Sequence, residues 1–127
     1  MKEFETAAFR MLIHDNLLKE VIVKKGVTLQ EKDVWESRDL SAAYKPGLKL
    51  YVIMEGEEGA EVSPDARRAA ASDDYSKHTA ALALGGSSLY QAIAGNLFLK
   101  INKPKVPTRY FDSREKALAW LKLIMNR

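Results

Sequence analysis

The sequence predicts an α/β fold with a five-stranded mixed sheet and four helices, in which an N-terminal antiparallel hairpin precedes parallel βα units. Two β-rich segments lie on either side of a short turn, and strand and helix signals then alternate to the end of the chain. Near the C-terminus an apolar helical pattern stops at two prolines. With 127 residues, the chain is long enough to bury a core as a single domain, residues 1–127.

The hairpin is predicted from two segments rich in β-branched and apolar residues. Phe9–His14 reads as the first strand and Leu18–Lys24 as the second, with Asp15-Asn16 as the turn. The short connection makes the two strands antiparallel neighbours.

A helix is predicted from Thr28 to Tyr44. Thr28 and Glu31 have the spacing of a capping box, and Pro46-Gly47 ends the segment. Its apolar period is poor, so the sequence does not show which face is buried.

The next unit begins with a strand at Lys49–Met54, followed by a loop through the Gly- and Glu-rich residues 55–62. Ser63 is an N-cap residue followed by Pro64 at the first helical position. A second helix therefore runs through the alanines at 66, 69 and 70.

Thr79–Leu84 is a short apolar run, which is typical of a strand that is buried on both faces. A third helix is expected after it. Its apolar face comprises Tyr90, Ile93, Ala94, Leu97, Phe98 and Ile101.

Pro104 and Pro107 end that helix, and Thr108–Phe111 becomes the last strand. Asp112 and Glu115 mark the start of a closing helix. Its buried side comprises Ala117, Leu118, Leu121, Ile124 and Met125.

Composition excludes several classes of protein. The chain has no cysteine, which removes disulfide scaffolds, thiolate metal sites and cysteine nucleophiles and makes a cytoplasmic setting the expectation. Met1–Glu5 shows no signal peptide, and no run approaches the roughly 18 apolar residues of a membrane span.

Charge is unevenly distributed along the chain. Residues 55–74 carry seven acidic and two basic groups, whereas residues 97–127 carry eight basic and two acidic groups. This pattern fits internal complementarity as well as it fits a nucleic-acid surface. Because the basic residues are not interleaved with exposed aromatics, no nucleic-acid partner is predicted.

The sequence offers little for catalysis or metal binding. Its two histidines, His14 and His78, are interpreted as solvated loop residues, and neither has ligand spacing to a second histidine or a carboxylate. The glutamates Glu55, Glu57, Glu58 and Glu61 lack the alternation of a calcium-binding loop. We therefore expect no enzyme activity, no metal and no cofactor.

Two segments are candidate binding sites. Gly85, Gly86, Ser87 and Ser88 follow a buried strand and open a helix, so their backbone N–H groups could hold an anion or a small ligand. The alternative is a glycine turn with a capping serine. Leu99 falls off the apolar stripe beside Lys100, Lys103 and Lys105, which suits either an interface or a distorted last helical turn.

The C-terminal half resembles a known family. Gly95–Pro107, Phe111 and Ala117–Leu121 are similar to a small bacterial family grouped with the STAS fold of anti-sigma-factor antagonists and the CRAL-TRIO lipid-binding fold. Ser63–Arg67 resembles the start of its second helix. The resemblance implies a mixed sheet of the SpoIIAA-like type, in a family whose members are mostly uncharacterised.

The resemblance also implies a role for one serine. STAS relatives bind proteins under the control of phosphorylation at a Ser or Thr near the start of the second helix. Ser63 is the nearest candidate phosphosite in this chain. Helix capping alone also accounts for a serine at this position.

The expected function is a non-enzymatic regulatory or protein-interaction module, with a protein partner or a second copy in a homodimer. The alternative is a binder of a small ligand or a lipid headgroup that uses the strand-end loops.

Overall fold

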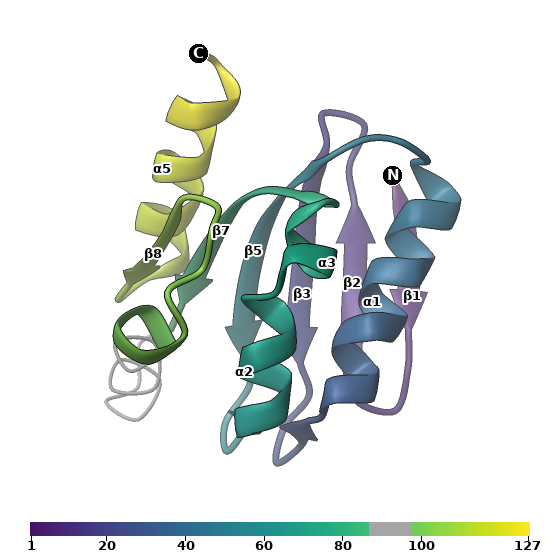
Figure 1. The fold of residues 1–127 in the computed structure, drawn as a ribbon, viewed down its shortest axis with the longest axis vertical. Coiled ribbons are helices and arrows are strands. Elements are labelled where there is room, and N and C mark those ends of the chain that lie inside the picture. The colour runs from purple at the N-terminus through teal and green to yellow at the C-terminus, as the bar shows by residue number, and fades with distance from the viewer. Residues whose placement is uncertain (87–97) are drawn as a thin grey trace.

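The protein, described by a computed structural model at residues 1–86 and 98–127, forms a six-stranded mixed sheet with helices on both faces (Figure 1). The sheet order is β1-β2-β3-β5-β7-β8. The strands are β1 (Lys2–Glu5), β2 (Phe9–Ile13), β3 (Leu18–Val23), β5 (Leu50–Gly56), β7 (Thr79–Gly85) and β8 (Thr108–Phe111). The first three are antiparallel, and every pair from β3 to β8 is parallel. The predicted fold class and hairpin are confirmed.

The predicted strand count of five is wrong because β1 was not anticipated. Its sequence, Lys-Glu-Phe-Glu, is mostly charged, and Phe4 is its one apolar residue. Phe4 pairs with Met11 of β2 and packs edge-on against Tyr44, with the ring centres 6.2 Å apart. A charged strand with one anchoring aromatic is typical of a sheet edge.

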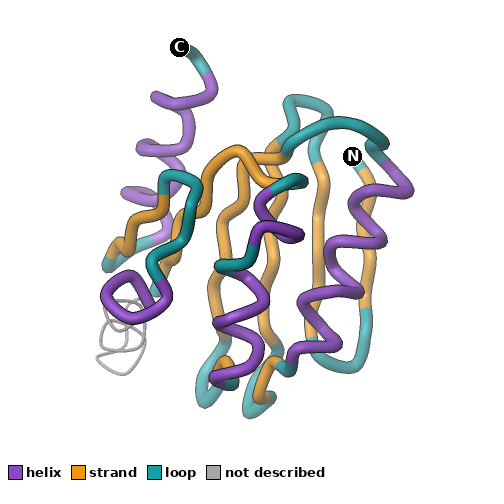
Figure 2. The backbone as a smooth tube through the Cα atoms, in the orientation of Figure 1, coloured by secondary structure: helices purple, strands orange, loops and turns teal. Residues whose placement is uncertain are grey.

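Two further strands form a separate short ladder between loops. These are β4 (Thr28–Leu29) and β6 (Glu61–Val62), which pair in parallel (Figure 2). Residues 55–62 are therefore not all loop, because β5 continues to Gly56 beside Val23 and β6 follows.

The predicted helix start at Thr28 is also wrong. The helix α1 (Glu31–Tyr44) begins after Gln30, whose backbone N–H donates to the Asp33 carboxylate at 2.8 Å. Thr28 pairs with Glu61 in the ladder instead. A capping pattern was present, but it lies two residues later along the chain.

Of the α-helices in the described residues, three lie on one face of the sheet and one lies on the other. In Figure 1, α1, α2 (Pro64–Ala70) and α3 (Asp73–Ser76) lie in front of the strands, and α5 (Arg114–Met125) lies beside β7 and β8. Ser63 caps α2 as predicted, whereas Ser113 rather than Asp112 caps α5. With a π-helical segment at Phe98–Asn102, the described residues hold five helices instead of four.

The core has two parts, one on each side of the sheet. The larger part lies under α1, α2 and α3 and includes Phe9, Met11, Ile13, Val21, Leu50 and Val52. The smaller part lies under α5 and comprises Ile53, Ala81, Ala83, Ala117 and Leu121. The consecutive buried residues of β7 supply both parts, which confirms its burial on both faces.

The segment predicted as the third helix is described only from Phe98 on, where Phe98–Asn102 is π-helical. Of the residues predicted for its apolar face, Tyr90, Ile93, Ala94 and Leu97 lie outside the described residues. Ile101 is 68% exposed, so its predicted burial is wrong. The last turn is π-helical, and its wider spacing moves residues off the three- and four-residue period on which that prediction rested.

Candidate functional site

An apolar pocket of about 100 Å³ opens at the carboxyl ends of the parallel strands. Val23, Met54 and Leu84 lie at or near the ends of β3, β5 and β7 and form its base. Its sides are apolar residues of α1, the β4–β6 ladder, α2 and β7: Leu29, Val34, Ala60, Val62, Ala66, Ala70 and Leu82. Strand ends of an open α/β sheet are a common place for a ligand.

The loops around the pocket are bound to each other along their length. Gly26 donates from its backbone N–H to the Glu58 carbonyl at 2.9 Å, and Glu61 donates to the Val27 carbonyl at the same distance. Gly26 and Gly59 have positive φ values of 69° and 75°, which suit glycine. A Cβ on Gly59 would lie 3.5 Å from the Gly26 Cα, so the two turns approach each other closely.

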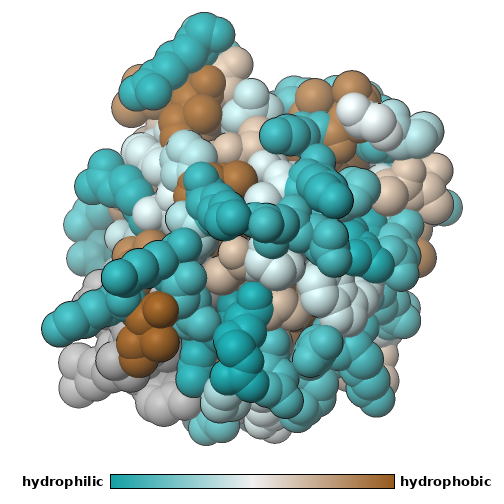
Figure 3. All heavy atoms as spheres, in the orientation of Figure 1, coloured by the Kyte–Doolittle hydropathy of each residue, from teal (hydrophilic) through white to brown (hydrophobic). Residues whose placement is uncertain are grey.

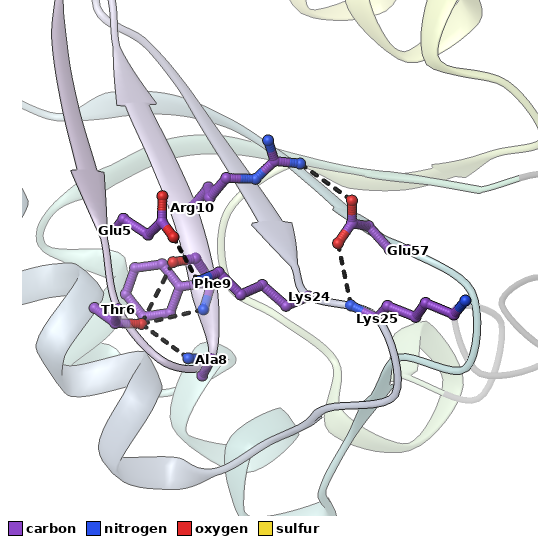
Figure 4. A network of polar contacts seen from close by, with 8 residues as sticks. All are labelled: Glu5, Thr6, Ala8, Phe9, Arg10, Lys24, Lys25 and Glu57. Carbon is purple, nitrogen blue, oxygen red and sulfur yellow. Dashed lines mark hydrogen bonds and ion pairs between the residues drawn. The ribbon is translucent and has the colours of Figure 1, made fainter.

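A polar network ties these loops to the hairpin (Figure 4). The Glu57 carboxylate accepts from the Lys25 backbone N–H and from the Arg10 guanidinium, each at 3.1 Å. The Lys24 amine pairs with Glu5 of β1 at 2.7 Å. Contacts from β1, the hairpin and the loop after β5 therefore hold these segments together.

Four of the described residues that line the pocket have ionisable side chains: Glu55, Glu61, Arg67 and Tyr110. Arg67 donates to the Val62 carbonyl at 2.9 Å. Glu55 pairs with Arg114 of α5. The Tyr110 hydroxyl donates to the Gly86 carbonyl at 2.6 Å. Burial and the nearby Asp112 charge raise the pKa of Tyr110, which keeps the phenol neutral.

The predicted anion site is only partly described. Gly85 lines the apolar pocket, and the Gly86 backbone N–H donates to the Phe111 carbonyl at 3.2 Å. Ser87 and Ser88 lie outside the described residues. Because the Gly86 donor is already used within the sheet, the described part of this segment presents a pocket wall and not an anion cradle.

Ser63 lies at the start of α2, near the mouth of the pocket. Its hydroxyl oxygen accepts from the Ala66 backbone N–H at 3.1 Å, as a helix cap does. The arginines nearby are engaged, Arg67 by the Val62 carbonyl and Arg68 by Asp65. These contacts account for Ser63 structurally, and its phosphorylation stays a prediction.

The sequence suggested that His14 is a solvated loop residue. In the structure its side chain is only partly exposed and contacts a buried carboxylate. Its Nε2 lies 2.5 Å from a carboxylate oxygen of Glu20, a buried residue of β3 on the α5 face of the sheet. Arg114 pairs with the same carboxylate and with Glu55. Burial would raise the pKa of Glu20, but Arg114 and His14 outweigh it and hold that pKa below its ordinary value.

The acidic segment does not gather its carboxylates around a common point. Glu55 is bound by Arg114, and Glu57 by Arg10 and the Lys25 N–H. Within residues 1–86 and 98–127, no group of three or more His, Cys, Asp or Glu side chains is placed to hold a metal ion. No helix in the same ranges is long and apolar enough to cross a membrane.

The predicted interface residues lie in and just after the π-helical segment Phe98–Asn102. Leu99 is partly buried and packs against the larger core, which favours the packing alternative at that position. Lys100, Lys103 and Lys105 are exposed, and Lys105 pairs with Asp73 at 2.5 Å. Ile101, between the first two lysines, is the exposed apolar residue here. An interface at this surface stays a prediction.

The sequence indicated the end of the sheet at which the pocket lies, but it did not indicate most of the residues that line the pocket. Leu29 and Val34 were placed in a helix whose buried face the sequence does not show, and Val62 was placed in a loop, so none of the three was predicted to line a pocket. The usable signal was topological, since the parallel strands β3, β5 and β7 end at one edge.

Comparison with known families places the chain. Residues 11–125 match a domain of unknown function, DUF7793, and the chain belongs to that family. No curated protein matches the chain.

The fold is similar to that of a solved structure. That structure is of an uncharacterised protein of the DUF3478 family from Shewanella loihica PV-4 with a SpoIIAA-like fold, at 17% sequence identity and a TM-score of 0.54. The match covers 90% of this chain and 92% of that one. This confirms the SpoIIAA-like resemblance at the level of the fold.

Proposed function

For this member of a family without an assigned function, we propose a non-enzymatic binding module that takes a compact apolar group of a small molecule into the pocket at the ends of β3, β5 and β7. The observation that carries the proposal is the pocket itself. Its lining is almost entirely apolar, with few polar groups. An apolar hollow with a few polar groups is the usual form of a small-molecule site.

The lining supports an apolar group and not a phosphate or other headgroup. An anion needs donors that point at it, and two donors near the pocket among the described residues have partners within the protein: the Gly86 N–H donates to the Phe111 carbonyl, and one Arg67 nitrogen donates to the Val62 carbonyl. The Glu55 charge is paired with Arg114, and the charges of Glu61 and Arg67 are opposite in sign. These groups favour a neutral ligand.

Size limits the ligand further. The pocket holds about 100 Å³, and an engineered cavity of about 150 Å³ is enough for benzene. A short branched alkyl group fits, while a full acyl chain does not. A larger ligand would leave its remaining atoms outside the pocket.

Preorganisation also supports binding. The β4–β6 ladder, the Gly26 to Glu58 hydrogen bond and the Glu57 contacts in Figure 4 hold the two loops in place. A wall that is already ordered loses less conformational entropy when the ligand enters.

Saturation-transfer NMR with isobutanol and benzene as probes tests the proposal. We expect transfer to at least one probe with the natural protein and none with Ala70→Leu, whose added side chain fills the pocket. Ala119→Leu is the matched control, since Ala119 is exposed on α5 and away from the pocket. The proposal fails if neither probe receives transfer, or if Ala70→Leu leaves the transfer unchanged while the variant still melts cooperatively.

A second candidate function is a protein contact, including a contact with a second copy. The face seen in Figure 3 is mostly hydrophilic, with apolar side chains in small separate patches. Ile101 is 68% exposed and lies between Lys100 and Lys103. It is therefore an exposed apolar residue on a basic surface. Light scattering after size exclusion should show a dimer that Ile101→Ser dissociates. A monomer at all concentrations tested would remove the homodimer.

A further inference from the structure

Lys19 is a buried lysine for which the described residues provide no carboxylate partner. It lies near the start of β3, beside Ile13 of β2 and Val52 of β5, and is 2% exposed. Its amine is 3.5 Å from the Ser37 carbonyl of α1 and 5.5 Å from the centre of the Tyr75 ring of α3. An ammonium group has three N–H donors, so this site leaves most of them unsatisfied.

The hydroxyl groups near the amine already have other hydrogen-bond partners. The Ser41 hydroxyl donates to the same Ser37 carbonyl at 2.7 Å. The Ser37 and Ser41 hydroxyls also lie 3.5 and 3.8 Å from the Met11 sulfur. The site therefore suits a neutral amine better than a charged one, and burial lowers the pKa of Lys19 to about 7.

Tyr75 is the titratable side chain in contact with the amine among the described residues. Burial raises the pKa of Tyr75 to about 12, so it stays neutral and supplies no countercharge. The facing residues of α1 are Ser37 and Ser41, and the neighbouring strand residues are Ile13 and Val52. None of these four carries a charge.

The elements that cover the amine differ in how firmly they are held. The helix α1 has 14 residues and buries Asp33, Val34, Ser37 and Ser41, and the Asp33 carboxylate accepts from the Gln30 backbone N–H at the start of the helix. The helix α3 has four residues and buries only Tyr75. Its acidic residues face outward in exposed pairs, Asp73 with Lys105 and Asp74 with Lys77, and such pairs contribute little. Of the two helices that cover the amine, α3 therefore requires less free energy to displace.

We propose that protonation of Lys19 releases α3 from the sheet and lets water reach the amine. The opening lies at the amino end of β3, whereas the apolar pocket lies at its carboxyl end. The helix α2 precedes α3 through Ala71 and Ser72, and Ser72 is hydrogen-bonded to Ala69 of α2. Release of α3 therefore also loosens the end of α2, whether or not the pocket has a ligand.

Hydrogen exchange by mass spectrometry at pH 6 and pH 9, corrected for intrinsic exchange rates, tests the proposal on the full chain. If the lysine pKa is 10.5 when open and about 7 when closed, opening at pH 6 exceeds that at pH 9 by roughly 100-fold. We expect protection of peptides across residues 72–79 to fall accordingly. The Lys19→Met variant should lose this dependence, and Lys49→Met, at an exposed position, should retain it.

The variants also separate Lys19 from the nearest histidine. His78 follows α3, and its backbone N–H donates to the Tyr75 carbonyl at 3.1 Å. A pH effect that persists in Lys19→Met would come from another group such as His78 and would overturn the proposal. If Lys19→Met does not fold, lysine side-chain NMR titration of the natural protein decides: a Lys19 pKa near 7 supports the proposal, and an ordinary value near 10 overturns it.

Discussion

Lys19 and Glu20 are consecutive residues of β3, and both are nearly inaccessible, at 2% and 7% exposure. They point to opposite faces of the sheet because side chains alternate along a strand. Glu20 meets two basic partners, Arg114 and His14. Lys19 meets a carbonyl and an aromatic ring under α1 and α3.

The difference shows that burial alone does not decide what a charged residue does to stability. Removing one partner of a buried ion pair is destabilising, because the other charge is left buried without a partner. A buried charge that has no partner opposes folding until it becomes neutral. The pKa directions agree with this reading. That of Glu20 is lowered despite burial, which favours its charged form, and that of Lys19 is lowered by burial, which favours its neutral form.

The largest expected effect is a gain from Lys19→Met. Unfolded lysine binds a proton up to pH 10.5 and the folded site only up to about pH 7, so stability rises with pH between these values. Removing the amine should raise the free energy of unfolding at pH 6 by about 4 kcal/mol. The gain should shrink towards pH 10, as denaturant melts at both pH values would show. A loss of stability at pH 6 would contradict this account.

Arg114→Met should have the next largest effect, in the opposite direction. It leaves Glu20 buried with only His14 and takes the partner from Glu55. Because Arg114 is itself partly exposed, we expect a loss of about 2 kcal/mol, below the range for fully buried pairs. Denaturant melts would measure it, with Lys122→Met on the exposed face of α5 as the control.

His14→Ala should cost less, about 1 kcal/mol, because Glu20 keeps Arg114 when the histidine is removed. A cost equal to that of Arg114→Met would mean that the two partners of Glu20 are equivalent. Melts of the two single variants and the double variant would give their coupling energy.

The smallest expected effect is on acid sensitivity. Because the pKa of Glu20 is lowered on folding, its contribution is present above its unfolded pKa and is lost as the pH falls through the folded value. Glu20→Gln should therefore make the fall in stability below about pH 4.5 shallower. An unchanged slope would show that other carboxylates dominate acid unfolding.

Elements with a strong apolar period were predictable from the sequence, and those defined by tertiary contacts were not. The strands β2, β3, β7 and β8 and the buried side of α5 follow from local pattern. β4 and β6 exist only because two loops meet, and no local signal marks such a pairing.

The candidate sites show the same division. Glycine and serine suggested a ligand position near Gly85, and that residue does line the pocket. The burial of Lys19 was hidden because a lysine in a strand usually reaches solvent, and only the packing of α1 and α3 above it prevents this. A side chain's surroundings come from elements distant in sequence.

The charged edge strand β1 has a consequence for solubility during folding. It pairs along β2, whose Phe9, Met11 and Ile13 are fully buried in the finished sheet. An unpaired β2 edge would offer its free backbone groups and these apolar side chains to another chain, which is how intermolecular sheets begin. The exposed Lys2, Glu3 and Glu5 put charges at that edge and so disfavour the addition of a further strand.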